Sequence, residues 1–170
     1  NWRAECNVSR GTRFGDIMAE KAFSFLSMPE RSNKPRTDGM TMCLDQGLGL
    51  RYTEDLLSIC SEYVDLWKLG WATTQLQPLD IVKKKVELLR SKNISVCNGG
   101  TLLELSEHQG KAEELFSELV EMGCDATEIS SGSLDIDSDR VVELIHSAKE
   151  KGLRVFCEVG KKLPEKDFGA

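Results

Sequence analysis

Apolar and polar positions follow two recurring patterns from residue 40 onward. Apolar runs of four or five residues predict buried strands, and the stretches between them carry polar loops and apolar side chains at helical spacing. The predicted strands are Met40–Leu44, Val64–Lys68, Ile94–Cys97, Asp125–Ile129 and Arg154–Glu158. The predicted helices are Thr53–Tyr63, Leu79–Ser91 with a lysine-rich outer face, Lys111–Met122, and Asp139–Lys151 capped by Asp137 or Ser138.

The spacing of the strands predicts an α/β fold. Their centres lie roughly 24 to 32 residues apart, as parallel strands joined by helical crossovers require. An open doubly wound sheet and part of a (β/α)8 TIM barrel both satisfy this spacing. Polar residues at the carboxyl end of every strand favour the barrel, and the chain lacks a G-x-G-x-x-G or Walker A pattern. These polar residues are Asp45, Lys68, Glu104, Glu128 and Lys162.

The length of the chain predicts an incomplete barrel. Eight βα units need about 250 residues, whereas 170 residues hold about the first five. Such a partial barrel exposes two sheet edges, so we expect either a fragment of a longer protein or edges covered by a homo-oligomer or another partner. We assign residues 40–170 to this partial barrel domain.

The first 39 residues lack the alternating strand and helix patterns of the rest of the chain. Residues 15–26 have apolar side chains at helical spacing, whereas Pro29, Pro35 and Gly39 favour turns. We therefore predict an N-terminal arm, residues 1–39, that contains one short helix and packs on the outside of the core.

Composition narrows the class of partner. The net charge of −6 and the pI near 5.1 argue against nucleic acid or an anionic membrane as the main partner. The six cysteines are widely spaced without a C-x-x-C pair, so we expect reduced, buried thiols. No apolar run approaches the roughly 18 residues of a membrane span, and we expect a cytoplasmic protein.

Lysines and carboxylates at the predicted strand ends are the candidate chemical groups. Lys68, Lys161 and Lys162 would supply a local cationic cluster in an acidic chain, suited to an anionic substrate. Asp45, Glu128 and Glu158 offer hard oxygen ligands for Mg²⁺. Two alternatives stay open: the glutamates pair with Lys68 and Lys161 to stabilise their burial, and Glu104 caps its own helix.

Five short motifs in order resemble the phosphosulfolactate synthase family, which also includes heat-stress-associated plant proteins. The similarity runs from about Phe23 to Asp167. The motifs are Leu44–Leu48, Lys68–Trp71, Gly99–Leu102 with Glu104, Glu128–Ser130 with Gly132 and Ser133, and Glu158–Lys162. The resemblance implies a (β/α)8 barrel and a lyase that adds sulfite to phosphoenolpyruvate with Mg²⁺, giving (2R)-3-phosphosulfolactate for coenzyme M biosynthesis.

The resemblance also implies roles for individual residues. Sulfite attack on the methylene carbon creates an aci-carboxylate, which a general acid then protonates. Lys162 matches the second lysine of the family's motif and is the candidate acid. The expected site residues are Lys162, Lys68 and Asp45 for catalysis, Lys161, Gly99, Gly100 and Thr101 for substrate binding, and Glu128 and Glu158 for the metal.

Three positions depart from the family pattern. Gln46 stands where a lysine is common, Ser131 where an aspartate is usual, and Ala72 where the family has glycine. The expected pocket thus lacks one positive and one negative charge. Gln46 and Ser131 favour a second hypothesis, a non-catalytic relative that acts as a structural or interaction subunit, whereas the run Glu158–Lys162 favours the enzyme.

Overall fold

The computed structural model describes residues 21–27 and 29–161, and contacts divide the chain into one unit up to Ser32 and another from Asn33. In the first unit, residues 22–25 form a turn in which the Leu26 N–H donates to the Phe23 carbonyl at 3.0 Å. Phe23 has a φ of 60°, which is incompatible with a right-handed helix. The predicted helix 15–26 is therefore wrong for residues 21–26, and its beginning lies outside the described residues.

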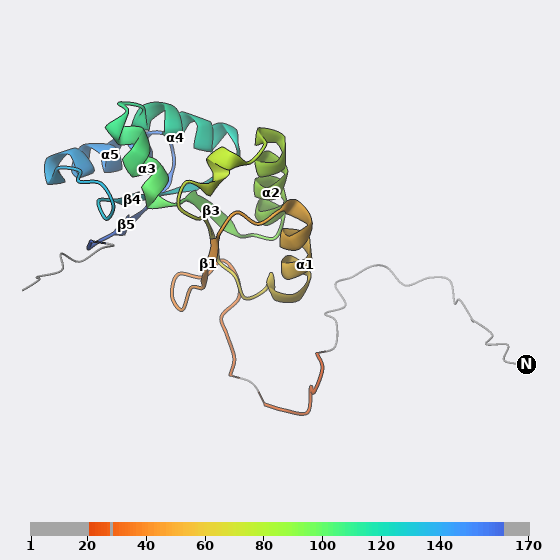
Figure 1. The fold of residues 1–170 in the computed structure, drawn as a ribbon. Helices are drawn as coiled ribbons and strands as arrows, with labels where there is room; N and C mark the ends of the chain where they lie inside the picture. Colours follow the sequence, from red (N-terminus) through yellow and green to blue (C-terminus); the bar gives the residue numbers. More distant parts are fainter. Residues whose placement is uncertain (1–20, 28, 162–170) are drawn as a thin grey trace, which may run out of the picture. The chain divides into compact units, whose positions relative to one another are not determined.

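The second unit alternates parallel strands and helices (Figure 1). Its elements are β1 (Met42–Asp45), α1 (Leu50–Cys60), β2 (Leu66–Leu69), the 3₁₀ helix η1 (Thr73–Leu76), α2 (Leu79–Ser91), β3 (Ser95–Asn98), α3 (Gly100–His108), α4 (Ala112–Glu121), β4 (Ala126–Ser130), α5 (Ser138–Glu150) and β5 (Arg154–Glu158). All five predicted strands and all four helices predicted after residue 40 are present. Asp137 caps α5, since its side chain accepts from the Asp139 N–H.

The described strands form two parallel ladders, β1–β2–β3 and β4–β5. Leu44 pairs with Lys68 and Lys68 with Cys97, whereas Glu128 pairs with Phe156. Side chains connect β3 to β4 where the backbone ladder is interrupted. Asn98 accepts from the Thr127 hydroxyl and donates to the Glu128 carbonyl, so the carboxyl ends of these strands are held close together.

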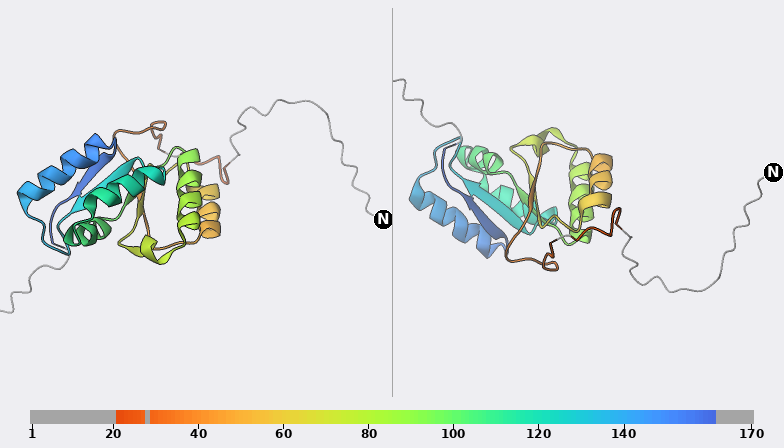
Figure 2. Two further views of the ribbon diagram at one scale, coloured as in Figure 1. Left: turned by 90° about the horizontal axis from the view of Figure 1, so that it is seen from above. Right: turned by 90° about the horizontal axis from the view of Figure 1, so that it is seen from below.

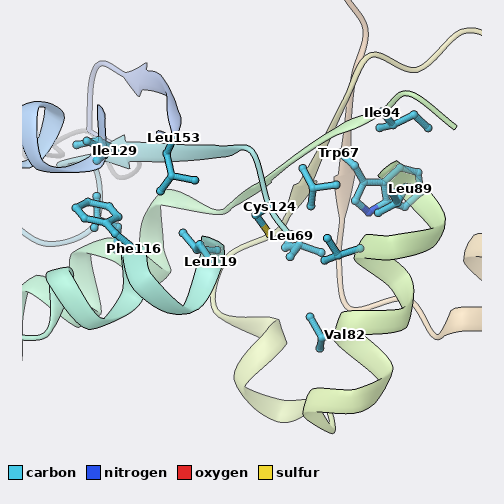
Figure 3. Close-up of a cluster of buried hydrophobic side chains, with 14 of the residues drawn as sticks. Trp67, Leu69, Val82, Leu89, Ile94, Phe116, Leu119, Cys124, Ile129 and Leu153 are labelled. Carbon is cyan, nitrogen blue, oxygen red and sulfur yellow. The ribbon is translucent and has the colours of Figure 1, made fainter. Parts of the chain in front are cut away.

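Each strand presents one face to the helices. The side chains on this face belong to the main apolar core between strands and helices or pack on it; they are Cys43, Trp67, Val96 and Ile129. Figure 3 shows Trp67 beside Leu89 of α2. Figure 2 shows α1 and α2 next to each other at one end of the unit and α5 at the other. The opposite strand face carries a smaller apolar cluster of Leu66, Cys97 and Ala126, against which Phe156 packs. We call this opposite face the inner face.

Two burial expectations need correction. Helix α2 does not carry all its lysines on an outer face, because Lys85 is fully buried. Cys97 and Cys124 are buried as expected, and burial raises the pKa of the Cys124 thiol to about 12, whereas Cys157 is exposed. Within the described ranges, no helix combines the length and apolar character that crossing a bilayer demands.

Candidate functional site

A cavity of about 220 Å³ opens where the parallel strands end. Its walls come from the carboxyl ends of β1, β2, β4 and β5 and from the amino end of α3. The lining residues are Leu44, Lys68, Trp71, Gly99, Gly100, Thr101, Glu128 and Glu158. The structure thus brings together six of the site residues predicted from sequence, from four separate segments. We call this cavity the strand-end pocket.

Glu128 is the central charged group of the strand-end pocket. One carboxylate oxygen accepts from Lys68 Nζ at 2.8 Å, and the other accepts from the Gly100 N–H at 2.9 Å. The Lys68 side chain is 16% exposed and that of Glu128 is 5% exposed, so water screens this pair poorly. Glu128 therefore links β2 to the amino end of α3, and the predicted pairing of Glu128 with Lys68 is confirmed.

At two glycines of the pocket wall, neighbouring protein atoms lie too close to the backbone for a side chain to fit. A Cβ on Gly99 would lie 2.5 Å from the Trp71 nitrogen, and one on Gly100 would lie 2.1 Å from Ser130 Oγ. No side chain fits at either position without displacing its neighbours. Gly99 and Gly100 are expected to bind substrate, and the groups that approach them most closely in the structure are protein atoms of Trp71 and Ser130.

Glu104 organises the loop after β4. Its fully buried carboxylate accepts from Ser130 Oγ and from three successive backbone N–H groups, those of residues 132–134, at 2.6–2.9 Å. Burial alone would raise the pKa of Glu104, but these hydrogen bonds outweigh it and lower the pKa. The alternative that Glu104 caps its own helix is wrong, because the amino end of α3 has no side-chain cap.

Asp45 lies outside the strand-end pocket. It follows the inward-facing Leu44 and points to the helix side of β1, where it is 1% exposed. Its carboxylate accepts from the Gly47 and Leu48 N–H groups, from Trp67 Nε1 and from Lys85 Nζ at 2.6–3.1 Å. Burial opposes ionisation, but the hydrogen bonds from Lys85, Leu48 and Trp67 hold the pKa of Asp45 below its usual value. This geometry orders a loop and does not place Asp45 beside the other site residues.

The remaining predicted residues have different positions. Glu158 ends β5 and lines the pocket. Lys161 donates to the Ser131 carbonyl at 2.9 Å and pairs with Asp135, so it contacts the loop after β4 rather than Glu158. The Ser131 hydroxyl accepts from the Ile136 N–H within the same loop. Lys162 lies outside the described residues, and its role stays a prediction.

The strand-end pocket is lined by two carboxylates, which is fewer than the protein ligands that enclose a metal ion. Across residues 21–27 and 29–161, no group of three or more His, Cys, Asp or Glu side chains is arranged to hold a metal ion. Mg²⁺ commonly uses one or two carboxylates and completes its shell with waters and substrate oxygens. Glu128 and Glu158 both line the strand-end pocket, and both oxygens of Glu128 already accept hydrogen bonds from Lys68 and Gly100.

Sequence reasoning missed Lys85 and, although it singled out Glu104, did not predict the role of that residue. Lys85 has no local signal, because it lies in a run of three lysines of which one turns inward. The role of Glu104 depends on the loop after β4, 26 residues away, and no spacing rule relates the two.

These features define a class: a βα-repeat protein with a charged pocket at the carboxyl ends of parallel strands, where such folds commonly hold their sites. The (2R)-phospho-3-sulfolactate synthase family model matches residues 29–169. The phosphosulfolactate synthase of Methanothermobacter thermautotrophicus is 44% identical over 146 residues, which cover 86% of this chain and 56% of that protein. The chain therefore belongs to the phosphosulfolactate synthase family.

Two further relatives agree with this assignment. The phosphosulfolactate synthase of Methanocaldococcus jannaschii is 41% identical over 129 residues, covering 76% of this chain and 51% of that protein. The phosphosulfolactate synthase of Bacillus subtilis is 33% identical over 137 residues, covering 81% and 53%. The chain thus spans about half the length of the curated relatives that it matches.

Proposed function

We propose that this chain forms the first part of a lyase that adds sulfite to phosphoenolpyruvate, giving (2R)-phospho-3-sulfolactate. The observation that carries the proposal is the strand-end pocket, in which Lys68 and the amino end of α3 converge on one small cavity. Both substrates are small anions, and a lysine and a helix amino end are suited to bind anions once the substrate replaces Glu128, to which both groups are bonded in the structure. The relatives' names specify a phosphosulfolactate synthase, and the family resemblance supplies sulfite and phosphoenolpyruvate as the proposed substrates.

The lysines and backbone groups of the pocket would have separate roles in this reaction. The sulfite sulfur forms a bond to the methylene carbon, the double-bond electrons move toward the carboxylate, and a proton then adds to the neighbouring carbon. Lys68 would bind an anionic substrate group, with the backbone of Gly99, Gly100 and Thr101 beside it, and Lys161 would contribute charge at the rim. We propose Lys162 as the general acid that delivers the proton.

We propose that Glu128 and Glu158 hold Mg²⁺ together with waters and substrate oxygens. A bound Mg²⁺ supplies positive charge that stabilises the developing aci-carboxylate. In the described structure Glu128 accepts hydrogen bonds from Lys68 and Gly100, so metal binding would require Glu128 to release at least one of these bonds. Asp45 would support the site from behind β1.

We further propose that the strands belong to a (β/α)8 barrel. The inner face of β1 and the residues before it are open, since Met40, Met42 and Leu44 are 37%, 47% and 44% exposed. Exposed apolar side chains in a row on an edge strand favour burial against further strands. The other half of the barrel, a second copy of the chain or a partner would cover them, in a cytoplasmic enzyme.

Product formation tests the proposed reaction. The chain is incubated with sulfite, phosphoenolpyruvate and Mg²⁺, alone and with the separately produced part of the Methanothermobacter relative that it does not match. We expect phospho-3-sulfolactate, detected by mass spectrometry, in the completed protein, and its loss on Lys162→Ala but not on the matched exposed change Lys84→Ala.

Absence of product in a folded, completed protein would reject the lyase. It would favour the non-catalytic interaction subunit, for which the departures at Gln46 and Ser131 argue. Retained turnover in Lys162→Ala would reject Lys162 alone as the acid and leave the reaction standing.

A further inference from the structure

Lys85 and Asp45 form a buried ion pair behind the strand-end pocket. Lys85 Nζ of α2 lies 2.8 Å from Asp45 Oδ2 at the end of β1, and their side chains are 0% and 1% exposed. An ion pair this deeply buried seldom adds net stability compared with apolar residues of the same size. Its presence therefore calls for a role besides stabilisation.

Apart from the bond from the Trp67 indole to Asp45 Oδ2, the remaining hydrogen bonds of the pair lead to loops at the strand ends. Asp45 Oδ1 accepts from the Gly47 and Leu48 N–H groups at 2.8 and 2.6 Å, which fixes the β1–α1 loop. Lys85 Nζ also donates to Gln77 Oε1 at 3.3 Å, just after η1. One buried lysine thus connects the segments that follow β1 and β2.

The main chain of Asp45 continues this connection toward the pocket. Its carbonyl accepts from the Gly70 N–H at 2.7 Å, and a Cβ on Gly70 would lie 2.4 Å from that carbonyl oxygen. Gly70 precedes Trp71, which lines the strand-end pocket and packs against Gly99. A shift of Asp45 would therefore be passed to the pocket wall through short, rigid contacts.

We propose that Lys85 is a positioning residue, which acts through Asp45 to hold the β1–α1 loop and the Gly70–Trp71 turn in the arrangement that shapes the strand-end pocket. The link to catalysis rests on the proposed function, whereas the ordering of the loops does not. Without the ammonium group, the buried carboxylate loses its counter-charge and turns toward water, which releases the Gly47 and Leu48 amides. The accompanying shift of the Asp45 main chain weakens the bond from the Gly70 N–H to the Asp45 carbonyl.

Amide hydrogen exchange measured by NMR tests the positioning role without any activity assay. In Lys85→Met, we expect exchange at Gly47, Leu48 and Gly70 to accelerate at least about tenfold more than at the core strand residue Val96. The Trp67 indole Nε1–H resonance should also shift, because its acceptor is Asp45 Oδ2. Lys84→Met, next along α2 and exposed, should change none of these signals.

Equal acceleration at all four amides would overturn the proposal, because it would indicate a purely global stabilising role. If Lys85→Met does not fold, the double change Asp45→Asn with Lys85→Met removes both charges and restores folding. We then expect fast exchange at the three loop amides and slow exchange at Val96, and slow exchange at all four would overturn the proposal. Failure of the lyase assay leaves these outcomes unaffected.

Discussion

Replacing Glu104 with alanine should cause one of the largest losses of stability in this chain. The change removes the acceptor of three backbone N–H groups and one hydroxyl, all held by a fully buried carboxylate. Leaving such donors without an acceptor costs about 3 kcal/mol or more in the free energy of unfolding. Urea denaturation measures the loss, and Glu104→Gln, which keeps one acceptor oxygen, should lose less.

The matched control is Glu107→Ala on the same helix. Glu107 pairs with Arg140, whose side chain is 39% exposed, so this change should cost about 1 kcal/mol or less. Because the folded pKa of Glu104 is lowered, its stabilisation is full above the ordinary carboxyl pKa near 4.3 and is lost as the pH falls through the folded value. The difference between the wild type and Glu104→Gln should therefore shrink below about pH 4. A difference that grows on acidification would contradict this account.

The second large effect is expected for Gly100→Ala. The new methyl carbon would lie 2.1 Å from Ser130 Oγ, 2.7 Å from Ser130 Cβ and 3.0 Å from Glu128 Oε1. Relief of these contacts requires α3 to move away from β4, which would stretch the Gly100 N–H bond to Glu128. Overpacking of this kind should cost about 2–3 kcal/mol, measured by thermal or urea unfolding.

Gly49→Ala is the control for the loss of a glycine. A Cβ there meets nothing within 4 Å, and the backbone φ of −72° suits any residue. We expect a change within about 0.5 kcal/mol. Equal stability of Gly100→Ala and Gly49→Ala would show that the tight packing of α3 on β4 does not exist in solution.

The periodic part of the fold was predictable from sequence because each strand and most helices carry a local signal. The run Arg154–Glu158 is a strand, as predicted, and Asp137 caps α5. The helix α3 was missed because it begins at Gly100, the second residue of a Gly-Gly pair that signals a loop. The helix predicted over residues 21–26 failed since amphipathic spacing does not reveal the left-handed conformation of Phe23.

The site was predictable only where parallel strands force residues together. The strand-end rule placed Lys68, Glu128 and Glu158 around one cavity, as the structure does. The same rule did not distinguish the two strand faces, so it grouped Asp45 with them although Asp45 turns toward α2. Glu104 and Lys85 depend on partners 26 and 40 residues away, and such contacts arise from packing rather than local sequence.

The central claim is that the strand-end pocket binds the anionic substrate, and titration with phosphoenolpyruvate followed by ¹H–¹⁵N NMR tests it most directly. We expect saturable shifts at the amides of Gly99, Gly100, Thr101 and Lys68. Lys68→Met should raise the Kd about tenfold, the loss expected for one charge-assisted hydrogen bond, and Lys84→Met should not change it. Saturable shifts elsewhere on the described surface, or none at the amino end of α3, would contradict the account.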